Sequence, residues 1–141
     1  YVYERSERDI SFNLKLFAQT GTELESIYKK MNRLTSLCYP EYMADVNLGG
    51  KLRMKPPLTK FRLGELFGKS KNELMGLIKS LNYSIDQSST WETQQGKRVP
   101  RHVTANITYQ VIHNSPPEME TSFYGYTGDD GRPPPTETPS L

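Results

Sequence analysis

The side chains that could act as nucleophiles or bases are few, and they follow no catalytic pattern. Cys38 is the single cysteine, and His102 and His113 are the only histidines among 141 residues. No Gly-x-Ser-x-Gly sequence occurs, and neither histidine has an acidic residue at a spacing typical of a catalytic triad. Cys38 follows Leu37 at the end of a predicted helix, where we expect a small core residue; the alternative is a reactive thiol. We therefore expect no enzymatic activity.

Metal and nucleotide sites are disfavoured by spacing as well. His102 and His113 lie 11 residues apart on one predicted strand, and this odd separation places them on opposite faces of a sheet. A single cysteine can build neither an internal disulfide nor a Cys-based metal cluster. Gly68-Lys69-Ser70 lacks the upstream glycine of a phosphate-binding loop, because Leu63 occupies that position. We expect no cofactor.

The polar sides of the predicted strands are the most informative feature. Solvated sheet faces usually carry Lys and Glu, whereas these positions carry hydroxyl and amide side chains, with Lys15 as the main exception. A neutral hydrophilic face suits a channel lining or a packed polar interface; the alternative is a solvent face chosen for strand propensity. The candidate lining residues are Ser11, Asn13, Ser80, Asn82, Ser84, Thr104, Asn106, Thr108 and Gln110.

Basic residues concentrate in predicted loops and short edge strands. A nucleic-acid-binding face would combine Lys and Arg with exposed aromatic residues, and the long strands are expected to lack that combination. The basic loops could instead contact an acidic neighbouring subunit, or could serve solubility alone. The candidates are Lys51, Arg53, Lys55, Lys97, Arg98 and Arg101.

These residues must be positioned by a small set of elements. Apolar residues alternate with polar ones from Ile10 to Leu16, which predicts a strand. Thr20 and Glu23 form a capping-box pattern, and helical spacing of apolar residues continues to about Leu37. No periodicity survives from Tyr39 to Gly50, so a loop is predicted there, followed by short strands on either side of Pro56 and Pro57.

Two further long strands complete the prediction. Residues 77–85 alternate, with Leu77 on the apolar side, Ile78 on the polar side and Lys79 as a charged residue on the apolar side. A turn is predicted at 94–96, and residues 103–111 show the clearest alternation in the chain. These elements predict an α+β, mostly β domain, in which an antiparallel sheet curls into a sandwich or barrel with one amphipathic helix packed on it.

The charge distribution divides the chain into two parts. Residues 1–113 hold 17 of the 18 Lys and Arg and 11 of the 16 Asp and Glu, a net charge of +6, and residues 114–141 carry −4 and six of the ten prolines. We expect a β domain over 1–113 and an acidic, Pro-rich extended arm over 114–141. Its aromatic residues Phe123, Tyr124 and Tyr126 would anchor it on a partner subunit; the alternative is a disordered terminus. No apolar stretch is long enough for a membrane span.

The order of these pieces resembles the tube-forming proteins at the baseplate end of contractile bacteriophage tails, and the tail tube initiators in particular. The likeness covers about residues 8–113 and depends on element order more than on an invariant motif. It is carried by the strand-and-helix order together with the runs IYKKMN (27–32), PP (56–57), LIKSLNY (77–83), WE (91–92), RVP (98–100) and VTANITYQVIH (103–113).

The resemblance implies a tube fold in which β-hairpins from six subunits line a continuous barrel, with the helix outside. It implies a structural virion protein: a hexameric ring in the phage tail baseplate, assembled in the host cytoplasm, that joins the central hub to the tail tube, initiates tube polymerisation and passes DNA during genome ejection. Partners would be further copies of the chain, hub and tube subunits, and DNA in transit, with no membrane. Lys15 would then be expected at a subunit contact. The alternative is a small β-barrel module that binds nucleic acid or peptide.

Overall fold

The computed structural model describes residues 2, 6–45, 51–69, 71–113, 116–119 and 123–126, and for residues 44–45 and 51–53 it describes the backbone alone. Six strands and one helix lie within these residues. In chain order they are β1 (Asp9–Phe17), α1 (Gly21–Ser36), β2 (Glu41–Asp45), β3 (Lys51–Lys55), β4 (Thr59–Phe61), β5 (Leu74–Ile85) and β6 (His102–Val111).

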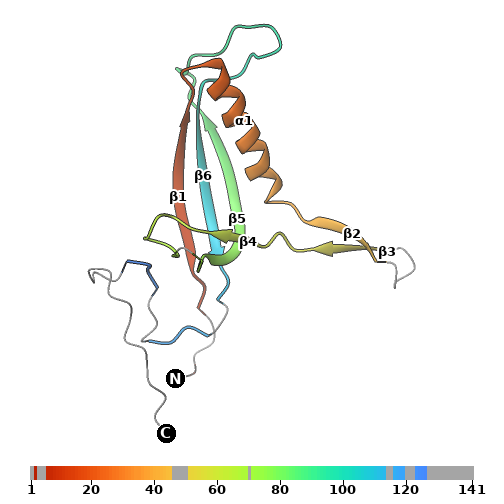
Figure 1. Cartoon of the computed structure of the whole chain (residues 1–141), viewed down its shortest axis with the longest axis vertical. Coiled ribbons are helices and arrows are strands. Elements are labelled where there is room, and N and C mark those ends of the chain that lie inside the picture. Colours follow the sequence, from red (N-terminus) through yellow and green to blue (C-terminus); the bar gives the residue numbers. More distant parts are fainter. Residues whose placement is uncertain are drawn as a thin grey trace.

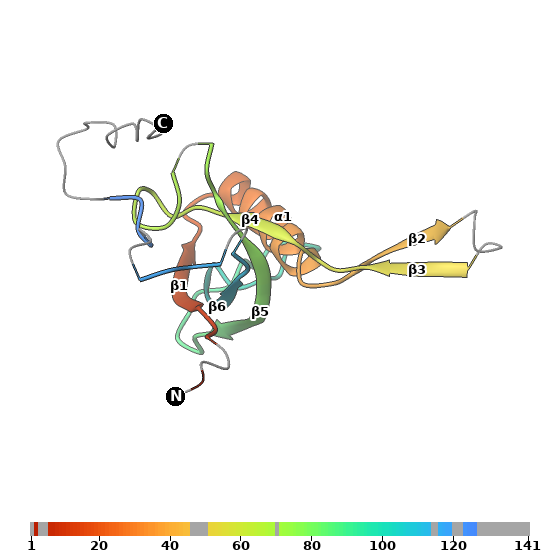
Figure 2. The same ribbon diagram turned by 90° about the horizontal axis from the view of Figure 1, so that it is seen from below.

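The three long strands predicted from alternation are present and lie side by side. The main sheet has the order β1-β6-β5-β4, and every neighbouring pair is antiparallel. The sheet curls into a half-barrel, which is clearest when it is viewed along its strands (Figure 2). The predicted mostly β domain with an antiparallel, curled sheet and one helix is thus confirmed at this level.

Helix α1 begins and ends close to the predicted residues. Its capping box is formed: Thr20 Oγ1 accepts a hydrogen bond from Glu23 N at 3.3 Å, and the Glu23 carboxylate accepts one from Thr20 N at 3.3 Å. The Tyr28 hydroxyl donates to Pro100 O at 3.0 Å, and the Thr35 hydroxyl lies 2.9 Å from the Tyr83 hydroxyl. These contacts hold the helix against the apolar face of the sheet (Figure 1).

The core lies on that face and is aromatic toward β4. The inward side chains of β6 are all buried, and Tyr109 is 2% exposed. The Phe61 ring lies 5.2 Å from Phe12 and 4.9 Å from Tyr109, between centroids. Ile10 and Val111 complete the buried cluster. The strong alternation in β6 follows from this one-sided burial.

The prediction of a loop from Tyr39 to Gly50 is wrong over its middle part. Strand β2 lies there and pairs with β3, from Glu41 opposite Lys55 to Asp45 opposite Lys51. This hairpin projects away from the main sheet (Figure 1). The described side chains of the hairpin, at residues 41–43 and 54–55, are all exposed, so these positions need no alternation of apolar and polar residues, and periodicity could not reveal β2.

The predicted side-chain directions at the start of β5 are also wrong, because a β-bulge interrupts the strand. Ile78 pairs with Tyr109 and Ser80 pairs with Thr108, which leaves Lys79 as the extra residue. Ile78 therefore packs on the core, while Leu77 lies opposite Gln110. Lys79 is not on the apolar side: its ammonium contacts the Asp9 carboxylate at 2.7 Å.

Candidate functional site

All nine candidate lining residues lie on one face of the sheet, opposite the face that α1 covers. The strand register arranges eight of them, together with Lys15, in three rows that cross β1, β6 and β5. The rows are Ser11–Thr108–Ser80, Asn13–Asn106–Asn82 and Lys15–Thr104–Ser84, and Gln110 lies one step further along β6. We call this surface the polar face. The β1 and β5 members are exposed and the β6 members are half-buried.

The polar face can offer hydrogen-bond donors and acceptors with little charge. Ser11 Oγ lies 3.2 Å from Thr108 Oγ1, so hydroxyl groups in one row contact each other. At one end, Asp9 and Lys79 neutralise each other as an ion pair across β6. Lys15 lies in the row with Thr104 and Ser84 and has no ion pair within the described part of the chain.

The opposite end of the polar face holds a group that the sequence analysis missed. Phe17 follows Lys15 on the polar face of β1, and it lies directly opposite His102. The two rings are 6.2 Å apart at an interplanar angle of 77°. Asp86 follows β5 and lies beside His102. Hydrogen bonds from Ser88 N and Oγ are the main causes of a lowered pKa of the Asp86 carboxyl, and His102 makes a smaller contribution.

This arrangement corrects the expectation that no long strand combines a basic residue with an exposed aromatic one. Lys15 and Phe17 share a face of β1, and Phe17 is 57% exposed. Its position was predictable from the two-residue period of the strand. The signal was missed because a phenylalanine at the end of an apolar alternation is ordinarily taken for a core residue.

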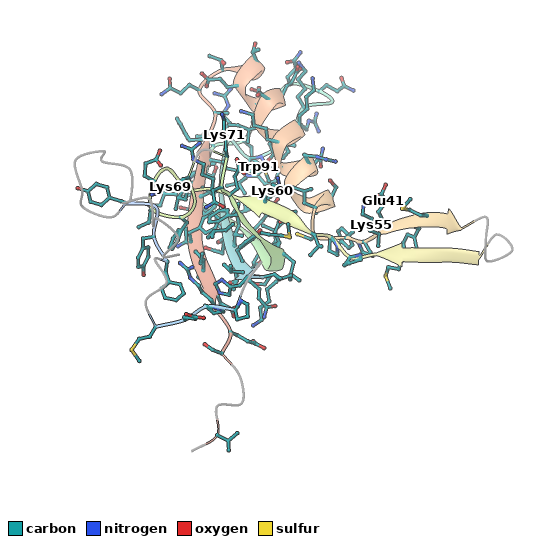
Figure 3. The ribbon with its side chains drawn as sticks, turned by 60° about the horizontal axis from the view of Figure 1, so that its bottom comes forward. Glu41, Lys55, Lys60, Lys69, Lys71 and Trp91 are labelled. Carbon is teal, nitrogen blue, oxygen red and sulfur yellow. The ribbon has the colours of Figure 1, made fainter. Side chains whose placement is uncertain are left out.

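The candidate basic residues do not form one surface. Lys55 belongs to the hairpin, with its ammonium 3.8 Å from the Glu41 carboxylate (Figure 3). Lys97 and Arg101 lie in the connection between β5 and β6, at the top of the main sheet and away from the hairpin (Figure 1). The side chains of Lys51 and Arg53 lie outside what the structure describes.

Besides Lys55, two of these basic side chains form ion pairs within the chain. Arg101 donates to Glu92 Oε2 at 2.6 Å, and this hydrogen bond is the main cause of a pKa of Glu92 below its ordinary value. Lys97 donates to Glu25 on α1 at 2.8 Å, which lowers the pKa of Glu25 and raises that of Lys97. Of the candidates with described side chains, Arg98 alone has no ion pair with another described residue.

Two of the predicted arm anchors contact the same chain. The Arg8 guanidinium carbon lies 5.6, 5.4 and 5.8 Å from the ring centroids of Phe67, Phe123 and Tyr124. Arg8 Nη2 also donates to Phe123 O at 3.0 Å. We call these four residues the Arg8 clasp. Tyr126, the third anchor, is 73% exposed, and most of the predicted arm over 114–141 lies outside the described residues.

The groups considered for catalysis do not converge. Cys38 is half-buried, and desolvation raises the pKa of its thiol, which disfavours the reactive thiolate. The His113 ring packs at 6.4 Å against Phe123, away from the Phe17 contact that His102 makes. Within the described residues, no three His, Cys, Asp or Glu side chains are placed to hold a metal ion. Nor does any described helix have the length and apolar character needed to cross a membrane.

Comparison with known proteins identifies no relative. No protein-family model, no curated protein sequence and no solved structure matches this chain. The functional interpretation therefore depends on the geometry of the polar face and on the sequence resemblance.

Proposed function

We propose that the chain is a structural subunit of a contractile phage tail. Six copies would close into a ring at the baseplate end, join the central hub to the tail tube, start tube polymerisation and line the channel through which DNA passes. The role involves no catalysed reaction. The observation that carries this proposal is that the nearly neutral polar face is bounded on both sides by unpaired strand edges.

The first edge belongs to β1. It pairs with β6 on one side, and no described strand pairs with it on the other. Val111 N donates to Arg8 O and Ala18 N donates to Arg101 O, so the even-numbered residues of β1 point their N–H groups toward β6. The odd-numbered residues therefore point their N–H groups outward, where a neighbour's strand could accept hydrogen bonds.

The second edge belongs to β5. Strand β4 pairs only with Leu74, Met75 and Gly76, so residues 77–85 of β5 have β6 as their single partner among the described strands. Joining this edge to β1 of the next copy would extend the sheet from copy to copy, and in a ring whose axis lies on the polar side the polar faces would come together around that axis. Closure removes exposed edges, which otherwise invite uncontrolled pairing.

The hairpin supports an assembly role independently. Tyr42 and Met54 lie opposite each other, 64% and 62% exposed, and Met43 is 53% exposed. Apolar side chains on an arm that projects from the body are costly to leave in water and favour contact with another protein subunit. The resemblance to tube initiators is consistent with such an arm reaching a neighbouring ring or hub.

The competing interpretation, a monomeric binding module for nucleic acid or peptide, requires its basic residues on one surface. Instead, the hairpin that carries Lys55 projects sideways from the body, whereas the β5–β6 connection that carries Arg98 lies at the top of the main sheet, so the two basic groups lie apart (Figure 1). This separation favours the ring.

The first test is the mass of the purified chain in solution, measured over a range of concentrations and combined with electron microscopy. We expect hexameric rings, or a monomer that forms rings when hub or tube subunits are added. A chain that stays monomeric under all these conditions contradicts the proposal.

A sharper test uses the direction of the N–H groups in β1. Asn13→Pro removes an outward N–H and leaves the β6 ladder intact, so we expect a folded chain that forms no rings. The matched control is Leu14→Pro, which removes an N–H that faces β6 and should destabilise the chain itself by about 2 kcal/mol. Rings formed by Asn13→Pro at the wild-type concentration would show that β1 is not the seam.

A further inference from the structure

The end of the polar face beyond the two neutral rows, Ser11–Thr108–Ser80 and Asn13–Asn106–Asn82, has a different chemistry. Lys15 and His102 are diagonal neighbours there, and Phe17 lies beside His102. The Lys15 side chain is exposed, and the Phe17 ring keeps more than half of its surface open to solvent although it belongs to a regular strand. A cation and an aromatic ring thus stand two residues apart on the same strand face.

The unpaired cation of this group favours an anionic ligand. Asp86, beside His102, is negatively charged, and its carboxylate accepts hydrogen bonds from Ser88 N at 2.9 Å and Ser88 Oγ at 2.8 Å rather than pairing with Lys15. The other acidic residue of the face, Asp9, is at the far end and is bound to Lys79. The Lys15 ammonium has no ion pair with any described residue. Its charge is therefore available to a partner.

We propose that Lys15, Phe17 and His102 form a contact site for DNA, in which Lys15 binds a backbone phosphate and Phe17 stacks on an unpaired base. Phosphate neutralisation and base stacking are the two terms that bind single strands without sequence preference. His102 packs edge-on against the Phe17 ring and holds it in place, so it acts here as a positioning residue. Single-stranded DNA and the frayed end of a duplex both present a backbone phosphate together with an unpaired base.

The inference deepens the proposed function, and its place in a channel rests on that function. In a closed ring, the site would repeat six times near one rim of the lumen, while the neutral rows behind it would not hold DNA. A leading DNA end would meet these contacts at the rim alone. The site itself, however, belongs to a single chain and can be tested without rings.

The experiment measures fluorescence anisotropy of dye-labelled DNA titrated with the full chain at several salt concentrations. The probes are a single-stranded oligonucleotide, a duplex with frayed ends and a blunt duplex of the same length. The variants are Lys15→Gln, Phe17→Ala and Phe17→Leu, which keeps an apolar side chain without a ring. Lys30→Gln, an exposed lysine on α1, is the matched control.

We expect Lys15→Gln to weaken binding several-fold and to lower the salt slope by about 0.7 for each phosphate that is no longer neutralised. Phe17→Ala and Phe17→Leu should both weaken binding of the single strand and of the frayed duplex by roughly 5- to 150-fold. Lys30→Gln should bind as the wild type does. Equal binding by all variants, equal loss in Lys30→Gln, or a blunt duplex bound as tightly as the single strand overturns the site.

Imaging of the same samples keeps the two proposals separable. Rings whose DNA binding ignores Lys15 and Phe17 would remove the contact site and leave the ring. Monomers that bind DNA through Lys15 and Phe17 would keep the site and remove the ring. Because the Lys15 and Phe17 side chains are exposed, the variants should unfold at the same urea concentration as the wild type. A lower unfolding midpoint would mean that misfolding explains the weaker binding, and this result would count against the site.

Discussion

Among the glycines that the structure describes, Gly76 leaves least room for a side chain. A Cβ at this position would meet Gln110 O and would lie 2.7 Å from Cε1 of Tyr109. We expect Gly76→Ala to lower the free energy of unfolding by about 2 kcal/mol or more, because backbone and ring must both move. Urea denaturation followed by Trp91 fluorescence measures this. Gly21→Ala is the control, since nothing lies within 4 Å of its Cβ, and it should leave stability unchanged or slightly raised.

Tyr109 links the stability of the fold to alkaline pH. Its hydroxyl donates to Thr59 O at 2.8 Å, and burial raises the pKa of Tyr109 above its ordinary value of 10.0. Below the unfolded-state pKa the tyrosine is neutral in both states and its contribution is fully present. As the pH rises through the unfolded value toward the folded one, the unfolded chain ionises first and stability is lost.

Tyr109→Phe tests this linkage. The variant should lose about 1 kcal/mol at neutral pH, because Thr59 O loses its donor, and should lose less stability than the wild type above pH ~10. The measurement is a series of urea unfolding curves from neutral to alkaline pH. Tyr42→Phe, on the exposed hairpin, should follow the wild-type curve; an identical alkaline loss in Tyr109→Phe and the wild type would refute the assignment.

At the scale of elements, the Lys79 bulge decides which side chains of β5 face the core. Deleting Lys79 would remove the bulge and leave Ile78 opposite Tyr109 and Ser80 opposite Thr108, so that both side chains keep their faces. We therefore expect the deletion to cost at most about 1 kcal/mol, from the lost ion pair with Asp9, measured as the urea midpoint. Lys79→Ala removes only a partly exposed ion pair with Asp9 and should cost at most about 1 kcal/mol. A deletion that costs roughly 2–3 kcal/mol more than Lys79→Ala, about the loss of a buried Ile78, would contradict this role.

The elements that could be predicted from sequence are those with one buried face. Strands β1, β5 and β6 and helix α1 have periodic sequences because the core lies on one side of each, and the same rule placed the nine candidate lining residues on one face of the sheet. The described side chains of β2 are all exposed, so this strand leaves no periodic signal. The bulge inserts one residue without changing the local composition. In both places the link between pattern and burial is broken, whereas Phe17 obeys the strand period and was missed because a phenylalanine is ordinarily taken for a core residue.

At the scale of the whole molecule, the Arg8 clasp ties the segment before β1 to residues 123–126. Gly125 N donates to Leu66 O at 3.3 Å, and a Cβ at Gly125 would lie 2.5 Å from Glu65 O. We expect Arg8→Ala to free this segment and to cost about 1 kcal/mol in the unfolding free energy, since its ring contacts are largely exposed. Faster hydrogen exchange at the Gly125 amide would report the release. Arg98→Ala should leave that amide protected; the same exchange rate in Arg8→Ala would show that the clasp does not hold the segment.

The strand order determines the relative direction in which β1 and β5 would meet between copies. Because β6 is antiparallel to both of its neighbours, β1 and β5 run the same way. In a ring with a single rotation axis every copy keeps its orientation, so β1 would meet the neighbour's β5 in parallel, whereas pairing within each copy is antiparallel. Such seams have evenly spaced, slanted hydrogen bonds, and they give the ring two unlike rims. A tube started from it would therefore have a fixed polarity, and the two rims could select different partners.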